Sequence, residues 1–183
     1  EFPVASTVGE LLKKRGLVSK RRRRHRSSPY PDRLGGYDGP NKIWCADFKG
    51  SFPVSGERCN PLTIMDGFSR YLLCCKAQNS STSEPTQRNF ERAFREFGLP
   101  DAIRTDNGPP FSSLAPGGLS RLAVWWIRLG IRPERIMPGR PDQNGRHERM
   151  HLTLKSETAR PPRSSFRAQQ KAFDSFRKEY NYE

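Results

Sequence analysis

The stretch from Ile103 to Phe111 constrains the fold more than any other part of this sequence. Its apolar start predicts a buried strand, and the Asn-Gly-Pro-Pro run that follows stops regular structure. Asp106 therefore lies at the carboxyl end of the strand, the edge at which open α/β sheets hold ligands and metals. An Asp before Asn-Gly is also a common turn residue, so Asp106 alone indicates a turn more strongly than a site. Its meaning depends on the other polar groups that join it.

Apolar runs on either side of this stretch predict an α/β fold with a mixed sheet. Before it, three strands form an antiparallel meander, and a helix with three Phe on one face ends at Gly98. After it come a helix ended by Gly130, a short strand, a loop rich in Pro and Gly, and two helices. The predicted strands are 43–52, 62–65, 71–77, the strand before Asp106 and 131–136; the predicted helices are 83–97, 119–129, 146–158 and one that Ser164 or Ser165 caps and that runs to Tyr180. The fold class expected is a five-stranded mixed sheet with helices on both faces.

The chain is strongly basic, with a net charge of +14, and residues 1–40 supply +6 of it from ten Lys/Arg and four Asp/Glu. We expect residues 1–40 to be a basic tail and linker, and residues 41–183 to be the folded domain. The run from Lys20 to Arg26 is either a solvated tail or an arm that binds phosphates. Nucleic acid is the leading partner for so basic a protein. A membrane surface is the weaker alternative, because the basic run lacks an apolar face, and no apolar run is long enough to cross a bilayer.

The four cysteines, Cys45, Cys59, Cys74 and Cys75, lack the C-x-x-C spacing of metal sites. We interpret them as reduced thiols in a cytoplasmic protein, and zinc or a disulfide is the less favoured interpretation. The neighbouring Cys74 and Cys75 would point to opposite faces of a strand.

Two other acidic residues stand in unusual places. Asp47 lies inside an apolar strand, where a carboxylate is costly unless it is paired or binds a cation. Strand alternation also allows it to face outward. Glu148 begins a helix directly after the Gly-rich loop, a position that the helix dipole favours for an acid without any further role. Each residue alone fits a structural role slightly better than a catalytic one.

The order of these residues adds a resemblance. Four blocks follow one another along the chain: Trp44–Phe48, Asp66–Arg70, Thr105–Gly108 and Gln143–Arg149. Together they resemble the DDE transposase and retroviral integrase superfamily, most closely its bacterial insertion-sequence branch. The resemblance implies a ribonuclease-H-like fold with Asp47, Asp106 and Glu148 as catalytic triad. It also implies that residues 1–26 are the tail of an upstream helix-turn-helix region.

Such a triad suits phosphodiester cleavage and the joining of a 3′ oxygen to another strand. Two divalent ions about 3.5–4 Å apart stabilise the attacking and leaving oxygens together. Carboxylates are the ligands that hard ions such as Mg²⁺ prefer, so we expect two Mg²⁺ or Mn²⁺ ions, with Asp47 bridging them. Water and then a DNA 3′-hydroxyl attack, so no nucleophilic Ser or Cys is needed.

Basic and amide side chains around the triad are expected to bind DNA, chiefly its phosphates. They are Lys20, Arg21, Arg22, Arg23, Arg24, Arg26, Asn107, Arg140, Asn144, Arg146, Arg149 and Lys155. The resemblance implies that Lys155, two helical turns after Glu148, touches phosphate near the reacting end. His151 is expected to pack or to contact phosphate rather than to bind metal, and Met150 and Leu154 are expected to face the core.

The function expected is that of the catalytic core of an insertion-sequence transposase. It would act on transposon ends and target DNA as a homo-multimer, because two ends must be joined, in the bacterial cytoplasm at the nucleoid. The alternatives are an inactive DNA-binding protein derived from a transposase and a ribonuclease-H-type nuclease acting on hybrids.

Overall fold

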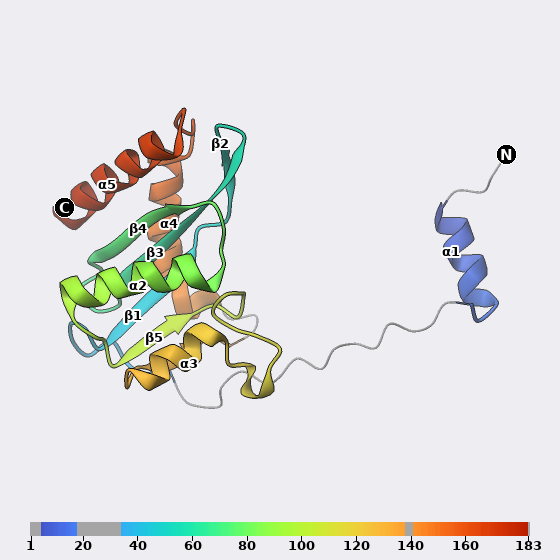
Figure 1. The fold of residues 1–183 in the computed structure, drawn as a ribbon, viewed down its shortest axis with the longest axis horizontal. Helices are drawn as coiled ribbons and strands as arrows, with labels where there is room; N and C mark the ends of the chain where they lie inside the picture. Colours follow the sequence, from blue (N-terminus) through green and yellow to red (C-terminus); the bar gives the residue numbers. More distant parts are fainter. Residues whose placement is uncertain (1–4, 18–33, 138–140, 183) are drawn as a thin grey trace.

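The computed structural model describes residues 5–17, 34–137 and 141–182 of the 183-residue chain. Residues 34–182 contain a mixed sheet with helices against both of its faces (Figure 1). The strands are β1 (Ile43–Phe48), β2 (Phe52–Val54), β3 (Glu57–Asp66), β4 (Leu72–Gln78), β5 (Ala102–Thr105) and β6 (Arg132–Arg135). The helices are α1 (Ala5–Lys14), α2 (Ser83–Phe97), α3 (Arg121–Arg128), α4 (Gly145–Thr158) and α5 (Phe166–Tyr182).

The sheet has the order β2-β3-β1-β5-β6. Strand β4 is not on this path and pairs with β3. Strands β1, β3 and β4 pair antiparallel as the predicted meander, whereas β1, β5 and β6 run parallel. The predicted fold class, an α/β mixed sheet between helices, is therefore confirmed. The sheet has six strands rather than five because Gly50, at φ 80°, breaks the predicted strand 43–52 into β1 and β2. Residues of L configuration seldom adopt that backbone region.

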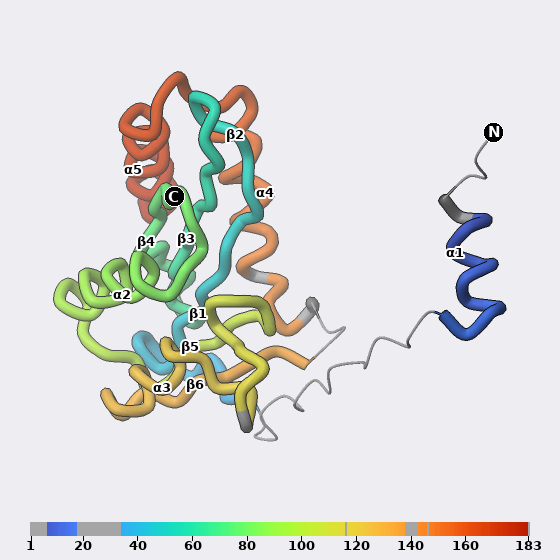
Figure 2. Tube along the Cα trace, turned by 45° about the vertical axis from the view of Figure 1, so that its right-hand side comes forward, coloured from blue at the N-terminus to red at the C-terminus, as the bar shows by residue number. Residues whose placement is uncertain are grey.

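The β2–β3 hairpin turns through Ser55 and Gly56, both at positive φ, which is the two-residue turn that suits the twist of antiparallel strands. Figure 2 shows the hairpin lying beside α4. Phe52 packs edge-on against Phe173 of α5, with ring centroids 6.5 Å apart.

The two faces of the sheet bury separate clusters of side chains. Helices α2 and α3 cover one face with Phe90 and Trp126, whose rings meet at 5.0 Å between centroids. Helices α4 and α5 cover the other face with Met150, Leu154 and Phe173. Met150 and Leu154 therefore face the core as expected.

The cysteines are free and buried, which agrees with the interpretation as reduced thiols. Cys74 belongs to one cluster and Cys75 to the other, so the pair does face opposite sides of β4. Burial raises the pKa of Cys59 to about 11 and the pKa of Cys74 to about 12, so both stay protonated thiols at neutral pH.

Helix α3 begins two residues later than predicted. The stripe of apolar residues suggested a start at Leu119, but Leu119 is extended and bridges to Ser112. Ser120 caps the helix instead, because its Oγ accepts a hydrogen bond from the backbone N–H of Ala123. The same hydroxyl donates to the carbonyl oxygen of Phe111, which ties α3 to the loop after Asp106.

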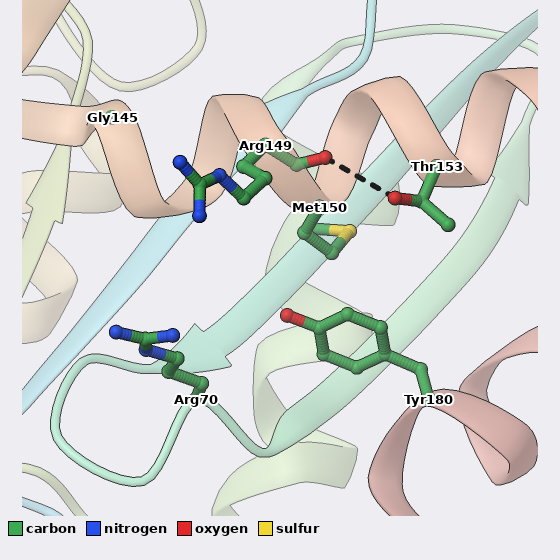
Figure 3. A pocket seen from close by; sticks show the side chains of 6 residues that line it. All are labelled: Arg70, Gly145, Arg149, Met150, Thr153 and Tyr180. Atoms are coloured by element: carbon green, nitrogen blue, oxygen red, sulfur yellow. Dashed lines mark hydrogen bonds between the residues drawn. The ribbon is translucent and has the colours of Figure 1, made fainter. Parts of the chain in front are cut away.

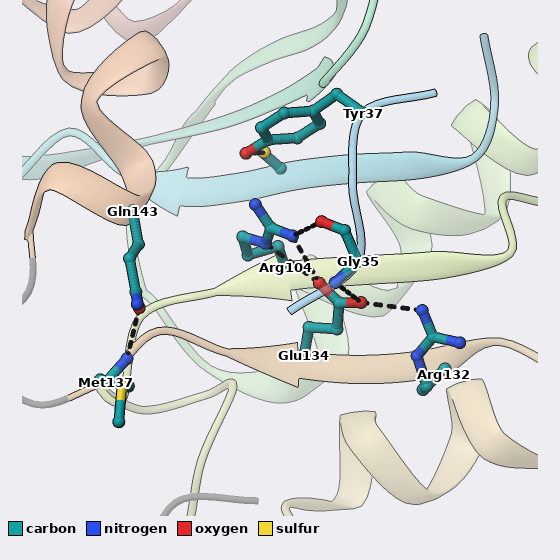
Figure 4. Close-up of polar contacts among 8 residues, drawn as sticks. Gly35, Tyr37, Arg104, Arg132, Glu134, Met137 and Gln143 are labelled. Carbon is teal, nitrogen blue, oxygen red and sulfur yellow. Dashed lines mark hydrogen bonds and ion pairs between the residues drawn. The ribbon is translucent and has the colours of Figure 1, made fainter. Parts of the chain in front are cut away.

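A buried ion pair holds the segment before β1 against the parallel strands (Figure 4). Arg104 of β5 donates to Glu134 of β6 from Nε at 3.0 Å and from Nη2 at 2.8 Å, and also to the carbonyl oxygen of Gly35 at 2.6 Å. The backbone N–H of Gly35 donates to Glu134 Oε1, and the ring of Tyr37 lies 4.7 Å from the Arg104 guanidinium. These contacts reach across residue 40, and the division of the chain at that residue stays a prediction.

In the part of the chain that the structure covers, no helix combines the length and apolar character needed to cross a membrane.

Candidate active site

The sheet brings two of the three predicted acids to neighbouring strand ends. Ala46 of β1 pairs with Thr105 of β5 in a parallel register. Asp47 and Asp106, the next residues in sequence, therefore lie at the same edge of the sheet. Parallel strands deliver successive residues to one side of a sheet, which is where the sequence placed the site. Glu148 lies in the first turn of α4, a helix that contacts β1.

Of the two aspartates at this edge, Asp47 has the more strongly raised pKa. Burial, the negative charge of Asp106 and, more weakly, that of Glu148 raise its pKa to about 7, although the N–H of Phe48 and the charge of Lys49 oppose the rise. Its Oδ1 accepts a hydrogen bond of 2.7 Å from the N–H of Phe48. Its side chain remains 22% exposed. Asp106 and Glu148 therefore both act on the charge of Asp47.

Asp106 occupies the turn that its sequence predicts. Burial raises its pKa, against a hydrogen bond from the backbone N–H of Gly108. A Cβ at position 108 would lie 2.9 Å from Asp106 Oδ2, so a larger residue there would push the carboxylate out of its position over the turn. Asn107 is exposed and donates from Nδ2 to the carbonyl oxygen of Ile136, which fastens this turn to the end of β6.

Glu148 differs from the two aspartates because it is exposed. Across the described ranges 5–17, 34–137 and 141–182, no three His, Cys, Asp or Glu side chains already form a group that could hold a metal ion. The donor set nevertheless fits a hard divalent cation, because three carboxylates offer only oxygen ligands and Asp47 is buried beside other acids.

Sequence reasoning missed a buried polar cluster under this edge, formed by Thr63 of β3 with His147 and His151 of α4. Thr63 Oγ1 lies 2.6 Å from His147 Nε2 and 2.7 Å from His151 Nε2. It also donates to the carbonyl oxygen of Asp47 at 3.0 Å. The available signal was the spacing of the two histidines, i and i+4, which puts both on one helix face. His151 packs in the interior, as expected.

The predicted DNA contacts fall into three groups. The run Lys20–Arg26 and Arg140 lie outside the described residues, as does the side chain of Arg146. Asn144 is buried, and its Oδ1 has no hydrogen-bond partner in the described structure, so its contact with DNA stays a prediction. Arg149 and Lys155 are exposed and therefore accessible.

The two accessible cations line different pockets. Arg149 borders a pocket of about 340 Å³ with Arg70 of the β3–β4 turn, and the hydroxyl of Tyr180 points into the space between them (Figure 3). Lys155 borders a pocket of about 360 Å³ with Lys49 and Arg160. The second pocket includes Lys49, whose charge lowers the pKa of Asp47.

Comparison with known proteins gives one family for most of the chain. Residues 38–141 match the family described as Integrase core domain, and residues 129–183 match a second family of the same description. An insertion element IS407 protein of Burkholderia multivorans is 28% identical over 151 residues, which cover 82% of this chain and 52% of the relative. An insertion element IS476 protein of Xanthomonas euvesicatoria is 30% identical over 140 residues, covering 76% of this chain and 39% of the relative. The chain thus spans about half or less of these relatives.

Solved structures share the fold at lower identity. The HTLV-2 integrase catalytic core domain in complex with magnesium, in its dimeric form, aligns with a TM-score of 0.56 and 21% identity over 75% of this chain and 84% of the other. The simian T-cell lymphotropic virus intasome aligns with a TM-score of 0.62 and 23% identity over 84% of this chain and 53% of the other. These similarities confirm the ribonuclease-H-like architecture expected from the sequence.

Proposed function

We propose that this chain, which belongs to the integrase core domain family, is the catalytic core of an insertion-sequence transposase. It cleaves DNA at the ends of a mobile element and joins the 3′ ends to target DNA. Asp47, Asp106 and Glu148 are its catalytic and metal-binding residues. The two relatives from insertion elements support a transposase rather than a viral integrase.

The observation that carries this proposal is the placement of Asp47 and Asp106. They follow paired residues of adjacent parallel strands, and burial with the charge of Asp106 raises the pKa of Asp47 to about 7. Perturbed carboxylates at such an edge are typical of functional sites, because a merely structural acid would be given a cation or several hydrogen-bond donors. The cationic side chain that lowers the pKa of Asp47 is Lys49.

Asp47, Asp106 and Glu148 would hold two Mg²⁺ or Mn²⁺ ions. Bound there, the ions supply charge stabilisation for the attacking and leaving oxygens at phosphorus. A solved relative of the same fold binds magnesium, which supports the choice of metal. Because Glu148 is exposed, its side chain is free to turn toward the aspartates when an ion arrives.

The protein's own residues would bind and orient the DNA. The pocket that contains Lys49 is also lined by Lys155 and Arg160, with no Asp or Glu among its lining residues. Three cations without a countercharge suit the phosphates of a strand that leads into the acids. The predicted contacts of Asn107, Asn144 and Arg149 and of the basic residues in 20–26, 140 and 146 belong to the same proposal.

The remaining features of the proposal concern organisation. Residues 1–40 would be a basic tail and linker and residues 41–183 the catalytic core. The active form would be a homo-multimer, as joining two ends requires two sites; solved structures of the same fold include dimeric, trimeric and intasome forms. The place of action would be the bacterial cytoplasm, at the nucleoid.

A strand-transfer assay tests the function. Labelled duplexes that carry the terminal sequences of the element encoding this chain are incubated with the protein and Mn²⁺ or Mg²⁺. We expect nicked ends and joined products, both lost in Glu148→Gln, which keeps the side chain's shape but not its charge. Binding of DNA to Glu148→Gln, measured by fluorescence anisotropy, should remain.

The same assay separates the two alternatives. Cleavage of an RNA–DNA hybrid without any joining would favour a ribonuclease-H-type nuclease. DNA binding that needs no metal, with neither cleavage nor joining, would favour an inactive DNA-binding protein.

A further inference from the structure

One hydroxyl oxygen joins three segments of the core beneath the acids. Thr63 pairs with Asp47 across the β1–β3 ladder, so its side chain starts directly beside that residue. From there Thr63 Oγ1 reaches the Asp47 carbonyl oxygen and the Nε2 atoms of His147 and His151. Thr63 and His147 are fully buried, and His151 is 5% exposed.

The hydrogens at this oxygen can be assigned by counting. A threonine hydroxyl has one hydrogen to donate and can accept two hydrogen bonds. The carbonyl oxygen of Asp47 can only accept, so it takes the single hydroxyl hydrogen. Both imidazoles must then donate, and each carries its hydrogen on Nε2 and a bare lone pair on Nδ1.

This assignment leaves Asp47 Oδ2 facing an acceptor. His151 Nδ1 lies 3.7 Å from Asp47 Oδ2, and with its hydrogen on Nε2 it has none to donate. The His151 ring therefore lies beside Asp47 Oδ2 without donating a hydrogen bond to it, and the lone pairs of this oxygen remain available to a cation. His147 Nδ1 is buried without a hydrogen-bond partner in the described structure. A buried unpaired nitrogen costs stability, which calls for a reason to keep the arrangement.

The arrangement also fixes the start of α4. The helix follows the short 3₁₀ turn Pro141–Asn144, and the side chain of Asn144 makes no cap hydrogen bond to it. His147 and His151 stand in its first two turns on either side of Glu148 in sequence. Their shared bond to Thr63 ties these turns to β3 and, through the Asp47 carbonyl oxygen, to β1.

We infer that Thr63, His147 and His151 are positioning residues that set the separation of Asp47 and Glu148 and thereby the affinity of the site for divalent ions. The inference rests on the proposed function, since it takes both acids as metal ligands. The three residues act through the acids and touch neither metal nor DNA.

The first test compares two substitutions of Thr63. The affinity of each variant for Mn²⁺ alone is measured by isothermal titration calorimetry. Thr63→Val keeps the shape of the side chain and removes the hydroxyl, whereas Thr63→Ser keeps the hydroxyl. We expect Thr63→Val to lower the Mn²⁺ affinity about 10–100-fold, the usual effect of removing a group that orients metal ligands. Thr63→Ser should restore an affinity close to that of the unmodified protein. A Thr63→Val protein that is folded and binds Mn²⁺ as tightly as the unmodified one would overturn the inference.

A second pair of variants guards against loss of folding in Thr63→Val. His147→Gln can still donate a hydrogen bond to Thr63, and His147→Leu cannot. We expect His147→Gln to bind Mn²⁺ more tightly than His147→Leu, and equal affinities would contradict the positioning role. A further readout needs no metal: NMR of the imidazole nitrogens should find both hydrogens on Nε2, and a hydrogen on Nδ1 of either ring would refute the assignment.

The outcome for the unmodified protein separates the two proposals. Suppose that the unmodified protein binds Mn²⁺ and that Asp106→Asn loses this binding. If Thr63→Val then binds Mn²⁺ as tightly as the unmodified protein, only the inference fails. If the unmodified protein binds no Mn²⁺, the proposed function fails and takes the inference with it.

Discussion

Two carboxylates in this sheet, the buried Glu134 and the half-buried Asp47, have opposite surroundings. Glu134 of β6 is 4% exposed and receives hydrogen bonds from Arg104, Arg132 and the N–H of Gly35. Although burial raises the pKa of Glu134, these partners lower it below its usual value. Asp47 of β1 receives one backbone hydrogen bond and faces other acids, and its pKa is raised to about 7.

The difference teaches what burial alone does not decide. An acid that serves the fold is surrounded by donors, so its charge is neutralised inside the protein. Among the described residues, the Asp47 carboxylate receives a hydrogen bond only from the N–H of Phe48, so its charge is compensated far less than that of Glu134. Two carboxylates two strands apart therefore have opposite pKa shifts because their partners differ.

The largest effect expected is on activity. Asp47→Asn should abolish DNA cleavage and joining, because it removes a carboxylate that the proposed ions need, yet the protein should stay folded. Product formation at the element ends, together with circular dichroism, checks both parts. An Asp47→Asn protein that cleaves and joins would remove the contrast between the two carboxylates.

The next effect is on stability, on the other side of the comparison. Arg104→Met removes the main partner of Glu134 and should lower the free energy of unfolding by about 3–5 kcal/mol, as for other broken buried ion pairs. Urea denaturation measures it. As a control, Arg104→Met combined with Glu134→Leu should regain most of the loss, because no uncompensated charge remains. A single variant as stable as the unmodified protein would show that the pair does not hold this part of the fold.

A smaller effect concerns metal. Added Mg²⁺ or Mn²⁺ should stabilise the folded protein by about 2.7 kcal/mol at one hundred times its dissociation constant, since it binds only the folded arrangement. Asp106→Asn should gain much less, and without metal it should melt at or above the unmodified protein, because three like charges become two. Thermal denaturation in EDTA and in tens of millimolar metal makes the comparison. Melting of Asp106→Asn well below the unmodified protein in EDTA would identify Asp106 as a structural cap.

The smallest effect expected is a dependence on pH. A carboxyl group whose pKa is raised in the folded state stabilises the protein below its unfolded pKa, near 3.9, and that stability is lost as the pH rises to about 7. For a side chain that is 22% exposed we expect about 1–2 kcal/mol after solvent screening.

Comparison of the unmodified protein with Asp47→Asn isolates this contribution, because His147 and His151 titrate in both. Their lowered pKa values act in the other direction, since neutral rings lose stability as the pH falls below about 6.5. The difference in unfolding free energy between the two proteins should change between pH 4 and pH 7 and level off above it. A difference that is flat over this range would mean that Asp47 is ionised in the folded protein.

The sequence predicted the parts of this structure that depend on local patterns. Alternation, helical stripes and turn residues located the strands, the helices and the turn that carries Asp106. The hairpin was missed because a single Gly50 divides what reads as one apolar run. The two buried polar clusters could not be predicted, since Thr63 lies 84 residues from His147 and Arg104 lies 30 residues from Glu134. Such pairings depend on which strands become neighbours, and no local pattern specifies them.

Hydrogen bonds hold Gly35 on Arg104 and Glu134, so the reach of the chain before it can be measured from a fixed point. Residues Lys20 to Arg26 stand 15 to 9 positions before Gly35. A fully extended chain covers at most about 3.3–3.6 Å per residue, so these cations stay within roughly 30–55 Å of the strand that ends at Asp106. If the basic run binds DNA as proposed, a spacing of about 3.4 Å per base pair would limit it to duplex within roughly 9–16 base pairs of Gly35. Each residue inserted or deleted between Arg26 and Gly35 should therefore shift the outer limit of its footprint on DNA by about one base pair.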